Sequence, residues 1–379
     1  MDFVSFEFAV VLVLTLPVYY ATPSRYRAML LAGLNLALLA WVAPVAALVV
    51  GALALAVFAL VTRASWRLAV VAALSVLGYV KYSHFAVANL HALGWAVPFP
   101  PFLSILGISY FAFRLVSFAL DVHRGVVHGP SLVSFFNYIL FFPTVVAGPI
   151  DRYNTFSEAA RPRMEELTPA VGRIITGLFK KAVLAGVLAG PAAALTVPGL
   201  PAARYLAAMY AYALLIYVDF SAYTDMAVGS ASLFGYRVME NFDRPYLKTN
   251  LSLFWKSWHM SLTRWFRDYL FIPLGGSRGT LARTVANTFL VMLVTGLWHG
   301  PSWNFVFWGL YHAVGLTVHR VYRTWAVPRL PRLWLAHPVS PVLSWALTFH
   351  FVAVGWVLFH AGTRQFIHIL GTLARGIWP

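Results

Sequence analysis

Two histidines of the chain lie in sequence surroundings that favour chemistry. His299 ends an apolar run and is followed by Gly300-Pro301, within the segment Gly296–Trp303. Glycine and proline at this point interrupt a helix, and the freed backbone groups are tolerated in an apolar region only where protein encloses a cavity. An imidazole at such a break is placed to accept a proton from a hydroxyl group. A histidine that simply bridges two helices explains the pattern equally well.

The second histidine, His259, lies in an aromatic and basic segment. At 100° per residue, a helix through this segment gathers large apolar side chains on one face: Trp255, Trp258, Leu262, Trp265, Phe266 and Tyr269. Lys256, Thr263 and Arg267 share another face, with His259 between the two. The pattern predicts an interfacial amphipathic helix whose cationic side faces the cytoplasm. That side suits a phosphorylated donor such as a coenzyme, although anchoring at lipid headgroups is an equally good interpretation.

Several other kinds of site are poorly supported. The two histidines belong to no HxxxH or HExxH pattern, and no Asp or Glu is near His299 in the sequence, so we expect no metal. The chain has no cysteine, which excludes disulfides and thiolate catalysis. A GxSxG serine motif is absent. The glycines of Leu274–Gly279 lack the GxxxxGK[ST] pattern of a phosphate loop and predict a tight re-entrant turn.

The composition indicates which elements must position these groups. Of 379 residues, 60% are hydrophobic and 11% are charged, against about 25% charged residues in soluble proteins. This excludes an ordinary soluble enzyme and a disordered chain, and predicts an all-α polytopic membrane protein with about ten helices. The net charge of +16 follows from basic cytoplasmic loops beside anionic lipids, and we expect no nucleic-acid partner.

Ten apolar runs are expected to form the helices: Val4–Tyr20, Ala28–Ala43, Val45–Val61, Leu68–Tyr79, Leu103–Leu120, Val171–Leu195, Tyr205–Phe220, Val285–Leu297, Trp303–Val318 and Val342–Phe359. Phe135–Val146 is too short to span and contains Pro143, which predicts a re-entrant or broken segment. The uncharged stretch 84–102, with His84 and His91, is predicted to be an external loop, and residues 236–283 a large cytoplasm-facing region. A short amphipathic tail is expected after Phe359.

The basic loops predict the orientation of the chain. The loops at 22–27, 62–67, 121–128, 151–166 and 320–332 carry the Lys and Arg residues and are expected in the cytoplasm, with the N-terminus outside. The acidic start Met1-Asp2-Phe3 predicts a retained first helix in place of a cleaved signal peptide. No stretch resembles a separate soluble domain, so residues 1–379 are interpreted as one domain.

At these residues the sequence resembles the membrane-bound O-acyltransferase (MBOAT) family, in particular its bacterial, polymer-modifying branch. The similarity extends in order from about residue 100 to residue 320. It is carried by Gly107–Tyr110, Phe141–Pro143, Ala147–Arg152, Asp219–Ala227, Glu240–Tyr246, Phe254–Leu262, Trp265–Leu270, Pro273–Gly276, Leu297–Gly300 and Trp308–His312.

The resemblance implies a fold and a site. The fold is a bundle of about eleven spanning helices with re-entrant and interfacial segments, and a buried site where a cytoplasmic and an external funnel nearly meet. Residues 1–100 form peripheral helices, 101–320 the family core and 321–379 the C-terminal helices. His299 matches the family's catalytic histidine and His259 its second functional one. The substrate-binding candidates are Trp258, Lys256, Arg267, Asp268, Trp298, Asn304 and His312.

The resemblance also implies the reaction and its partners. An acyl group passes from a thioester donor in the cytoplasm, acyl-CoA or an acyl carrier protein, to a hydroxyl of an extracytoplasmic polysaccharide or teichoic-acid-like polymer, directly or through a periplasmic acyltransferase partner. No cofactor is bound permanently, and membrane lipids surround the chain. The location implied is the bacterial cytoplasmic (inner) membrane. Some motifs are similar to the D-alanylating branch and others to the alginate-acetylating branch, so acetyl and D-alanyl both stay open.

Two functions from other classes compete with this reading. Broken helices and buried histidines also suit a proton-coupled transporter or channel. The lack of an inverted repeat and the scarcity of acidic residues in the apolar runs argue against it. A non-catalytic membrane scaffold of a polymer-modifying machine is the other alternative. It predicts that replacing His299 by alanine leaves acylation of the polymer intact.

Overall fold

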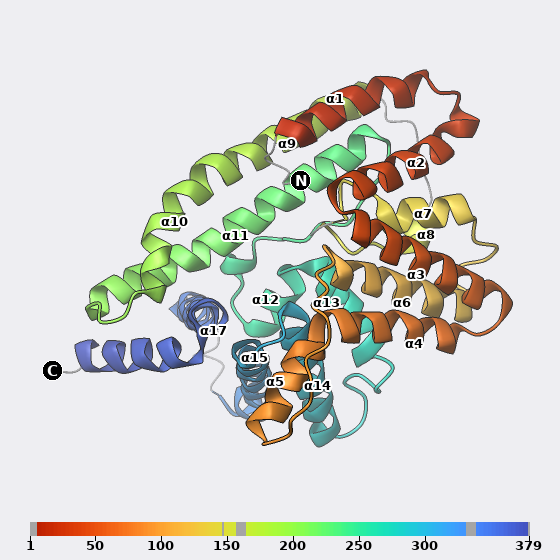
Figure 1. The fold of residues 1–379 in the computed structure, drawn as a ribbon. Helices are drawn as coiled ribbons and strands as arrows, with labels where there is room; N and C mark the ends of the chain where they lie inside the picture. The colour runs from red at the N-terminus through yellow and green to blue at the C-terminus, as the bar shows by residue number, and fades with distance from the viewer. Residues whose placement is uncertain (1–5, 146–147, 157–163, 331–338, 378–379) are drawn as a thin grey trace. The chain divides into compact units, whose positions relative to one another are not determined.

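The computed structural model describes residues 6–145, 148–156, 164–330 and 339–377, and these ranges contain helices and turns but no β-strand. Figure 1 labels the helices along the chain. The described chain divides into two compact units, each of which is considered by itself. Unit 1 comprises 1–179 and 222–240, and unit 2 comprises 180–221 and 241–379. The single-domain interpretation concerns independent folding, which this division does not test, and it stays a prediction. Residues 157–163 and 331–332, in two of the predicted basic loops, lie outside the described residues.

Unit 1 is a helical assembly in which α3 and α4 pack on α6, and α2 packs on α7. Its elements are α1 (Phe6–Ala21), α2 (Ser24–Val42), α3 (Pro44–Arg63), α4 (Trp66–Leu77), the π-helical turn η1 (Gly78–Tyr82), α5 (Ser83–Ala92), α6 (Ile108–His123), α7 (Leu132–Leu140), α8 (Tyr153–Phe156), α9 (Met164–Phe179) and the C-terminal part of α11 (Ala202–Leu233). The α2–α3 corner falls at Ala43-Pro44 because proline is favoured in the first turn of a helix.

The predicted broken segment is held by the buried guanidinium of Arg114. The helix α7 ends at Leu140, and the chain turns through 141–145. Arg114 Nη1 donates to the carbonyls of Tyr138 and Ile139, and Nη2 to the carbonyl and hydroxyl of Thr144 and the carbonyl of Pro149, at 2.8–3.3 Å. One cation therefore satisfies the carbonyl groups left free where α7 stops. These hydrogen bonds explain the burial of Arg114 by a structural role.

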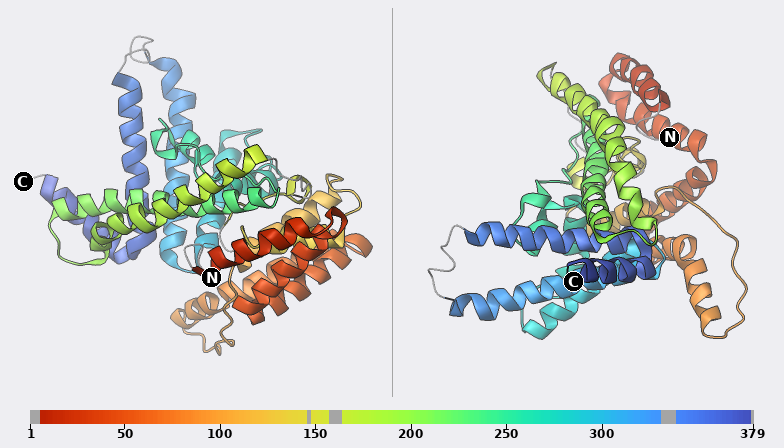
Figure 2. Two further views of the ribbon diagram at one scale, coloured as in Figure 1. Left: turned by 90° about the horizontal axis from the view of Figure 1, so that it is seen from above. Right: turned by 90° about the vertical axis from the view of Figure 1, so that its left-hand side faces the viewer.

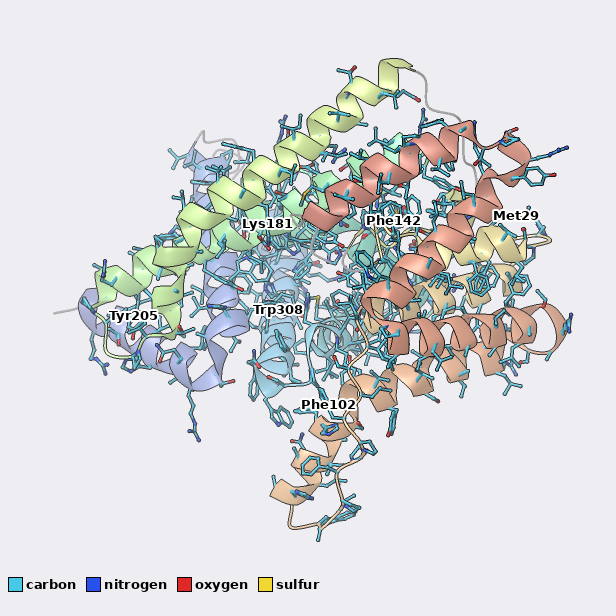
Figure 3. The ribbon with its side chains drawn as sticks, turned by 45° about the horizontal axis from the view of Figure 1, so that its top comes forward. Met29, Phe102, Phe142, Lys181, Tyr205 and Trp308 are labelled. Carbon is cyan, nitrogen blue, oxygen red and sulfur yellow. The ribbon has the colours of Figure 1, made fainter. Side chains whose placement is uncertain are left out.

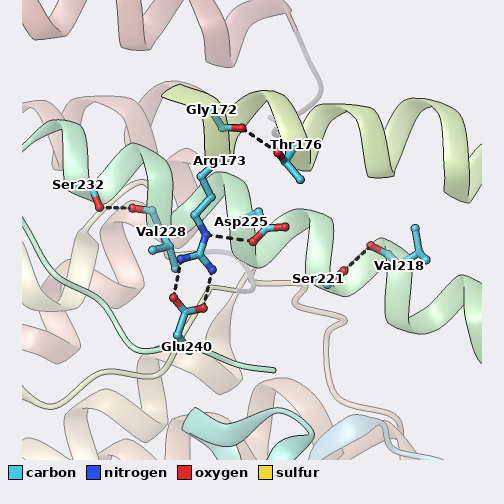
Figure 4. Close-up of polar contacts among 9 residues, drawn as sticks. All are labelled: Gly172, Arg173, Thr176, Val218, Ser221, Asp225, Val228, Ser232 and Glu240. Carbon is cyan, nitrogen blue, oxygen red and sulfur yellow. Dashed lines mark hydrogen bonds and ion pairs between the residues drawn. The ribbon is translucent and has the colours of Figure 1, made fainter. Parts of the chain in front are cut away.

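Within unit 1, α9 and the end of α11 pack through glycines. A Cβ on Gly177 would lie 2.7 Å from the Ala222 carbonyl oxygen, and one on Gly229 2.7 Å from the Ala170 carbonyl oxygen. Small residues of this kind let helices approach closely in membranes. Beside them the Arg173 guanidinium lies between the carboxylates of Asp225, at 3.0 Å, and Glu240 (Figure 4). The charge of Arg173 is thus paired with two carboxylates.

Unit 2 contains the π-helical turn η2 (Lys180–Ala185), α10 (Gly186–Ala193), η3 (Ala194–Thr196), the first part of α11, η4 (Pro245–Leu247), α12 (Leu251–Ser257), α13 (Met260–Phe266), the π-helical turn η5 (Arg267–Phe271), α14 (Leu281–His299), α15 (Trp303–Val321), η6 (Tyr322–Ala326), η7 (Val327–Arg329) and α17 (Val339–Ile377). Helix α15 packs against both α14 and α17 (Figure 2). The core of unit 2 is aromatic and includes the fully buried Trp308 (Figure 3). The Trp308 ring is stacked on that of Trp356, also fully buried, with centroids 5.7 Å apart.

Six helical stretches among the described residues are long and apolar enough to cross a membrane. They are Pro44–Arg63, Trp66–Ala92, Glu166–Thr196, Ala202–Leu233, Leu281–His299 and Val339–Gly376. The prediction of a polytopic, all-helical membrane protein is confirmed at this level. The count of about eleven spanning helices, the two funnels and the orientation of the loops stay predictions.

Three predicted boundaries are wrong. His84 and His91 lie in α5, which continues α4 through the π-helical turn, so the loop begins only at Leu93. The run predicted from Leu103 becomes helical only at Ile108, after Gly107 with φ 73°. The single amphipathic helix predicted through His259 is instead two short helices, α12 and α13. The continuous aromatic and cationic faces predicted for it are therefore interrupted at the break.

Candidate functional site

The break between α14 and α15 places His299 at a helix end, as the sequence predicted. Helix α14 ends at His299, the chain is extended at Gly300 and Ser302, and α15 begins at Trp303. The two helices then pack closely. A Cβ on Gly296 would lie 2.2 Å from the Phe305 carbonyl oxygen, and one on Gly309 2.3 Å from the Met292 carbonyl oxygen. The glycines therefore bring the imidazole directly against α15.

His299 is half-buried among aromatic rings. Its ring centroid lies 4.9 Å from Trp298, 5.1 Å from Trp308, 5.0 Å from Phe359 and 6.3 Å from Phe305. Trp298 and Trp308 are buried, whereas Phe305 and Phe359 are half-buried. The imidazole is thus fixed on its inner side and approachable on the side of the two phenylalanines.

His259 occupies the break between α12 and α13. Trp258 is extended and His259 is left-handed, with φ 43°, a conformation rare for residues with a side chain. Asn241 holds this turn, because its carbonyl accepts from Met260 N at 2.9 Å and its Oδ1 accepts from the Ser261 hydroxyl at 2.6 Å. Strained residues of this kind persist only where tertiary contacts over-determine them, and they concentrate at functional sites.

The imidazole of His259 is 2% exposed and lies against two rings. The Phe220 ring is 4.7 Å away and the Trp298 ring 5.9 Å away. Trp298 also contacts His299, so one indole connects the two histidines. Burial, and to a smaller extent the nearby His299, lower the pKa of His259 well below its usual range. His259 is therefore neutral at physiological pH.

His312 lies in the same unit, one turn beyond Trp308 on α15, and is fully buried. The rings of Trp308 and Trp255 are 4.8 Å and 5.0 Å from it. Neither ring nitrogen has a hydrogen-bond partner among the described residues, and the same holds for the indole nitrogens of Trp255 and Trp308. A Cβ on Gly355 would lie 3.0 Å from His312 Nε2, so α17 closes this position tightly.

The remaining predicted substrate-binding residues lie in different surroundings. Trp258 is buried in the core against Phe242, Tyr246, Phe254 and Trp356. Lys256 is exposed on α12. Arg267 Nε pairs with Asp268 Oδ1 at 2.7 Å on η5. Asn304 Oδ1 accepts from the Ser302 hydroxyl, and Nδ2 donates to the Phe359 carbonyl at 3.3 Å.

A cavity of about 190 Å³ lies within unit 2, among α12, α13, η5, α14 and α15. Its walls are mostly apolar, and include Trp255, Phe266, Met292 and Leu316. Thr263 and Arg267, from the predicted cationic face, also line it, whereas Lys256 does not. The helix break therefore divides the predicted cationic face, and its C-terminal half, with Thr263 and Arg267, borders this cavity.

Among the residues that the structure describes, no three or more His, Asp or Glu side chains gather in a way that could hold a metal ion. The two predicted catalytic histidines and His312 are connected through the rings of one aromatic cluster, and they do not form such a group with Asp or Glu among the described residues. The absence of a metal requirement stays a prediction.

Sequence reasoning gave no role to three residues that shape the site. Asn241, which is fully buried, positions the His259 turn, and the rings of Phe305 and Phe359 border the approachable side of His299. Asn241 stands in one of the motifs that carry the family resemblance, which was the available signal. No local pattern marks Phe305 or Phe359, because their role depends on the packing of α14, α15 and α17.

The structure defines a helical membrane protein with a histidine at a broken helix end. The model of the membrane-bound O-acyltransferase family matches residues 54–358. The chain belongs to this family and is an O-acyltransferase, which confirms the resemblance found in the sequence.

Three curated relatives show the range of the similarity. The probable alginate O-acetylase of Azotobacter vinelandii is 37% identical over 92% of this chain and 72% of its own length. The peptidoglycan O-acetyltransferase of Helicobacter pylori is 32% identical, over 78% of this chain and 61% of its own. The teichoic acid D-alanyltransferase of Bacillus subtilis is 32% identical, over 68% of this chain and 69% of its own. All three names describe the transfer of an acetyl or D-alanyl group to a polymer.

Proposed function

We propose that the chain moves an acetyl or D-alanyl group from a cytoplasmic thioester to a hydroxyl of an extracytoplasmic polymer, or of a partner that passes it on, in the bacterial inner membrane. The observation that carries the proposal is the position of His299, the half-buried imidazole at the end of α14. A general base must exchange protons with a substrate, and His299 combines approachability with a fixed ring. His259 and His312 are fully enclosed.

In the proposed reaction His299 first accepts and then returns one proton. His299 takes the proton of the acceptor hydroxyl as its oxygen attacks the thioester carbonyl. The carbon–sulfur bond then breaks, and the thiolate leaves with the proton returned from the imidazolium. Base catalysis of this kind typically contributes about 10²–10⁴-fold in rate. A His259 that stays neutral does not repel the imidazolium formed on His299.

The cavity beside Arg267 supports a route for the donor. A mostly apolar cavity with one cation, Arg267, and three threonine hydroxyl groups on its wall suits the arm of a thioester, with the cation near an anionic group. The donor class, coenzyme A or a carrier protein, the cytoplasmic entry and the polymer are parts of the proposal. The relatives' names support a polymer acceptor.

His299→Gln is the direct test. Glutamine keeps a hydrogen-bonding side chain but takes no proton at neutral pH, so transfer should be abolished while insertion and folding are retained. Two readouts suffice: ester-linked acetyl and D-alanine released from the polymer by mild alkali, and thiol released from acetyl-coenzyme A by isolated membranes. His368→Gln, an exposed histidine on α17, is the matched control and should keep full transfer.

The two outcomes distinguish catalysis by His299 from a non-catalytic scaffold. Loss of both signals in His299→Gln supports general-base catalysis. Ester content at the wild-type level in that variant would favour the scaffold and would refute a chemical role for His299.

A further inference from the structure

The approachable side of His299 is bordered by two phenylalanines from different helices. Phe305 lies in the first turn of α15 and Phe359 in α17. Their ring centroids are 4.9 Å apart, so the rings contact each other as well as His299. With Trp298 and Trp308 on the buried side, the four rings form an aromatic enclosure around the imidazole.

The backbone around the enclosure fixes these rings. Gly300 has no side chain, and a Cβ there would lie 2.3 Å from the Phe305 ring. The Asn304 amide donates to the Phe359 carbonyl at 3.3 Å. The Phe359 ring also packs on Trp308 and Trp356, at 5.4 Å and 5.5 Å. Because each ring has neighbours on several sides, neither can turn away without unpacking the core.

The geometry of acyl transfer places the acyl group in the same region. The acceptor oxygen must lie within about 3 Å of the base and within roughly 3–3.5 Å of the carbonyl carbon in a reactive arrangement. The carbonyl carbon is then about 6 Å from the imidazole. The Phe359 and Phe305 ring centroids lie 5.0 Å and 6.3 Å from the His299 ring, about as far as the carbonyl carbon, so these rings flank the acyl group on the side of His299 that they contact.

We propose that Phe305 and Phe359 are specificity-determining residues that limit the transferred acyl group to two or three carbons. The inference rests on the proposed function, because it places the thioester carbonyl at His299. It goes beyond that function by naming the side chains that reject longer chains. A misfit of one methylene in a close-packed site is worth about 10–200-fold in kcat/KM, so the limit should be sharp.

The test is a series of acetyl-, propionyl-, butyryl- and hexanoyl-coenzyme A with membranes that contain the wild-type or variant full-length chain. In the wild type, kcat/KM should fall at least about tenfold between propionyl and butyryl. In Phe359→Ala and Phe305→Ala the ratio of butyryl to acetyl kcat/KM should rise by about tenfold or more. Phe359→Leu, which removes less volume, serves where the alanine variant folds poorly.

Phe349→Ala is the matched control. Phe349 is also half-buried on α17, but its ring contacts Tyr210, Tyr246 and Trp345 and not His299. It should keep the wild-type chain-length profile, and His299→Gln should be inactive with every donor.

The outcomes distinguish a failure of the inference from a failure of the proposed function. An increased butyryl-to-acetyl ratio in the two enclosure variants alone supports the inference. His299-dependent acetyl transfer with an unchanged profile in those variants would overturn the inference and leave the proposed function standing. Wild-type membranes that transfer neither acetyl from these thioesters nor D-alanyl from a carrier-protein thioester would overturn both.

Discussion

Replacing Gly296 by alanine tests whether the close approach of α14 and α15 sets the catalytic geometry. The new Cβ would lie 2.2 Å from the Phe305 carbonyl oxygen, where real Cβ atoms stay beyond 3.0 Å. The three nearest atoms, the carbonyl oxygen and carbon of Phe305 and the Cα of Gly309, all belong to the backbone, so no side chain can rotate to relieve the contact. The helices must therefore separate by roughly an ångström, and His299 moves relative to the rings of α15.

The structure sets the size of the effect. Overpacking at such a contact costs about 1–3 kcal/mol in stability, and a 1 Å misplacement of reacting groups costs about 10²-fold in rate. We expect Gly296→Ala to remain inserted and folded but to lose about 10²-fold in acyl transfer. The measurement combines thiol release by expression-matched membranes with denaturant unfolding of the purified chain in detergent.

Gly190→Ala is the control for a glycine replaced in a helix of the same unit. A Cβ on Gly190 in α10 meets nothing within 4 Å. Alanine is favoured over glycine in helices by about 0.5–1 kcal/mol, so this variant should keep its activity and gain slightly in stability. Wild-type activity and stability in Gly296→Ala would refute the argument that close packing of these helices positions His299.

Three further predictions concern other parts of the chain. Arg114→Leu leaves several buried carbonyl groups unpaired and should destabilise by about 3 kcal/mol or more, seen as a lower denaturant midpoint; an unchanged midpoint would contradict the role given to Arg114. The pKa of His259 is lowered in the folded state, so the unfolded chain binds this proton more readily. The contribution of His259 to the free energy of unfolding is therefore complete above about pH 6.5 and decreases on acidification, by up to about 1.4 kcal/mol per pH unit. His259→Asn, which tolerates the left-handed backbone, should flatten this pH dependence in unfolding experiments. Reporter fusions in Arg63–Arg67 and Arg320–Arg332 should report the cytoplasm, and fusions in 93–102 the outside; an outside signal from 320–332 would reject the orientation.

The helix break at His299 was predictable because its causes are local. Gly300 and Pro301 stop α14 wherever the rest of the chain lies, and the glycines before Leu281 turn the chain in the same way. The composition indicated a membrane protein for a similar reason, because a long apolar helix can span a bilayer whichever helices lie beside it. The motifs that carry the family resemblance, including the one at His299, are local as well.

The surroundings of the two other histidines depended on contacts between distant residues. The periodicity of 255–269 favours one continuous helix, and nothing local opposes it. The break at Trp258-His259 forms because Asn241 satisfies the backbone and hydroxyl groups at the start of α13. Hydrogen bonds of this kind outweigh helix periodicity only once the chain has packed.

By itself, then, the sequence determined that the protein is a helical membrane acyltransferase with His299 at a broken helix end. Only the tertiary structure decided that His259 is buried and left-handed, that His312 lies in the same aromatic cluster, and that Phe305 and Phe359 border the approachable side of His299. The physical reason is that backbone breaks follow from local residue types, whereas burial and ring contacts follow from which helices meet. These helix–helix contacts depend on small residues such as Gly296, Gly309 and Gly355. Their importance is seen only when a second helix packs against them.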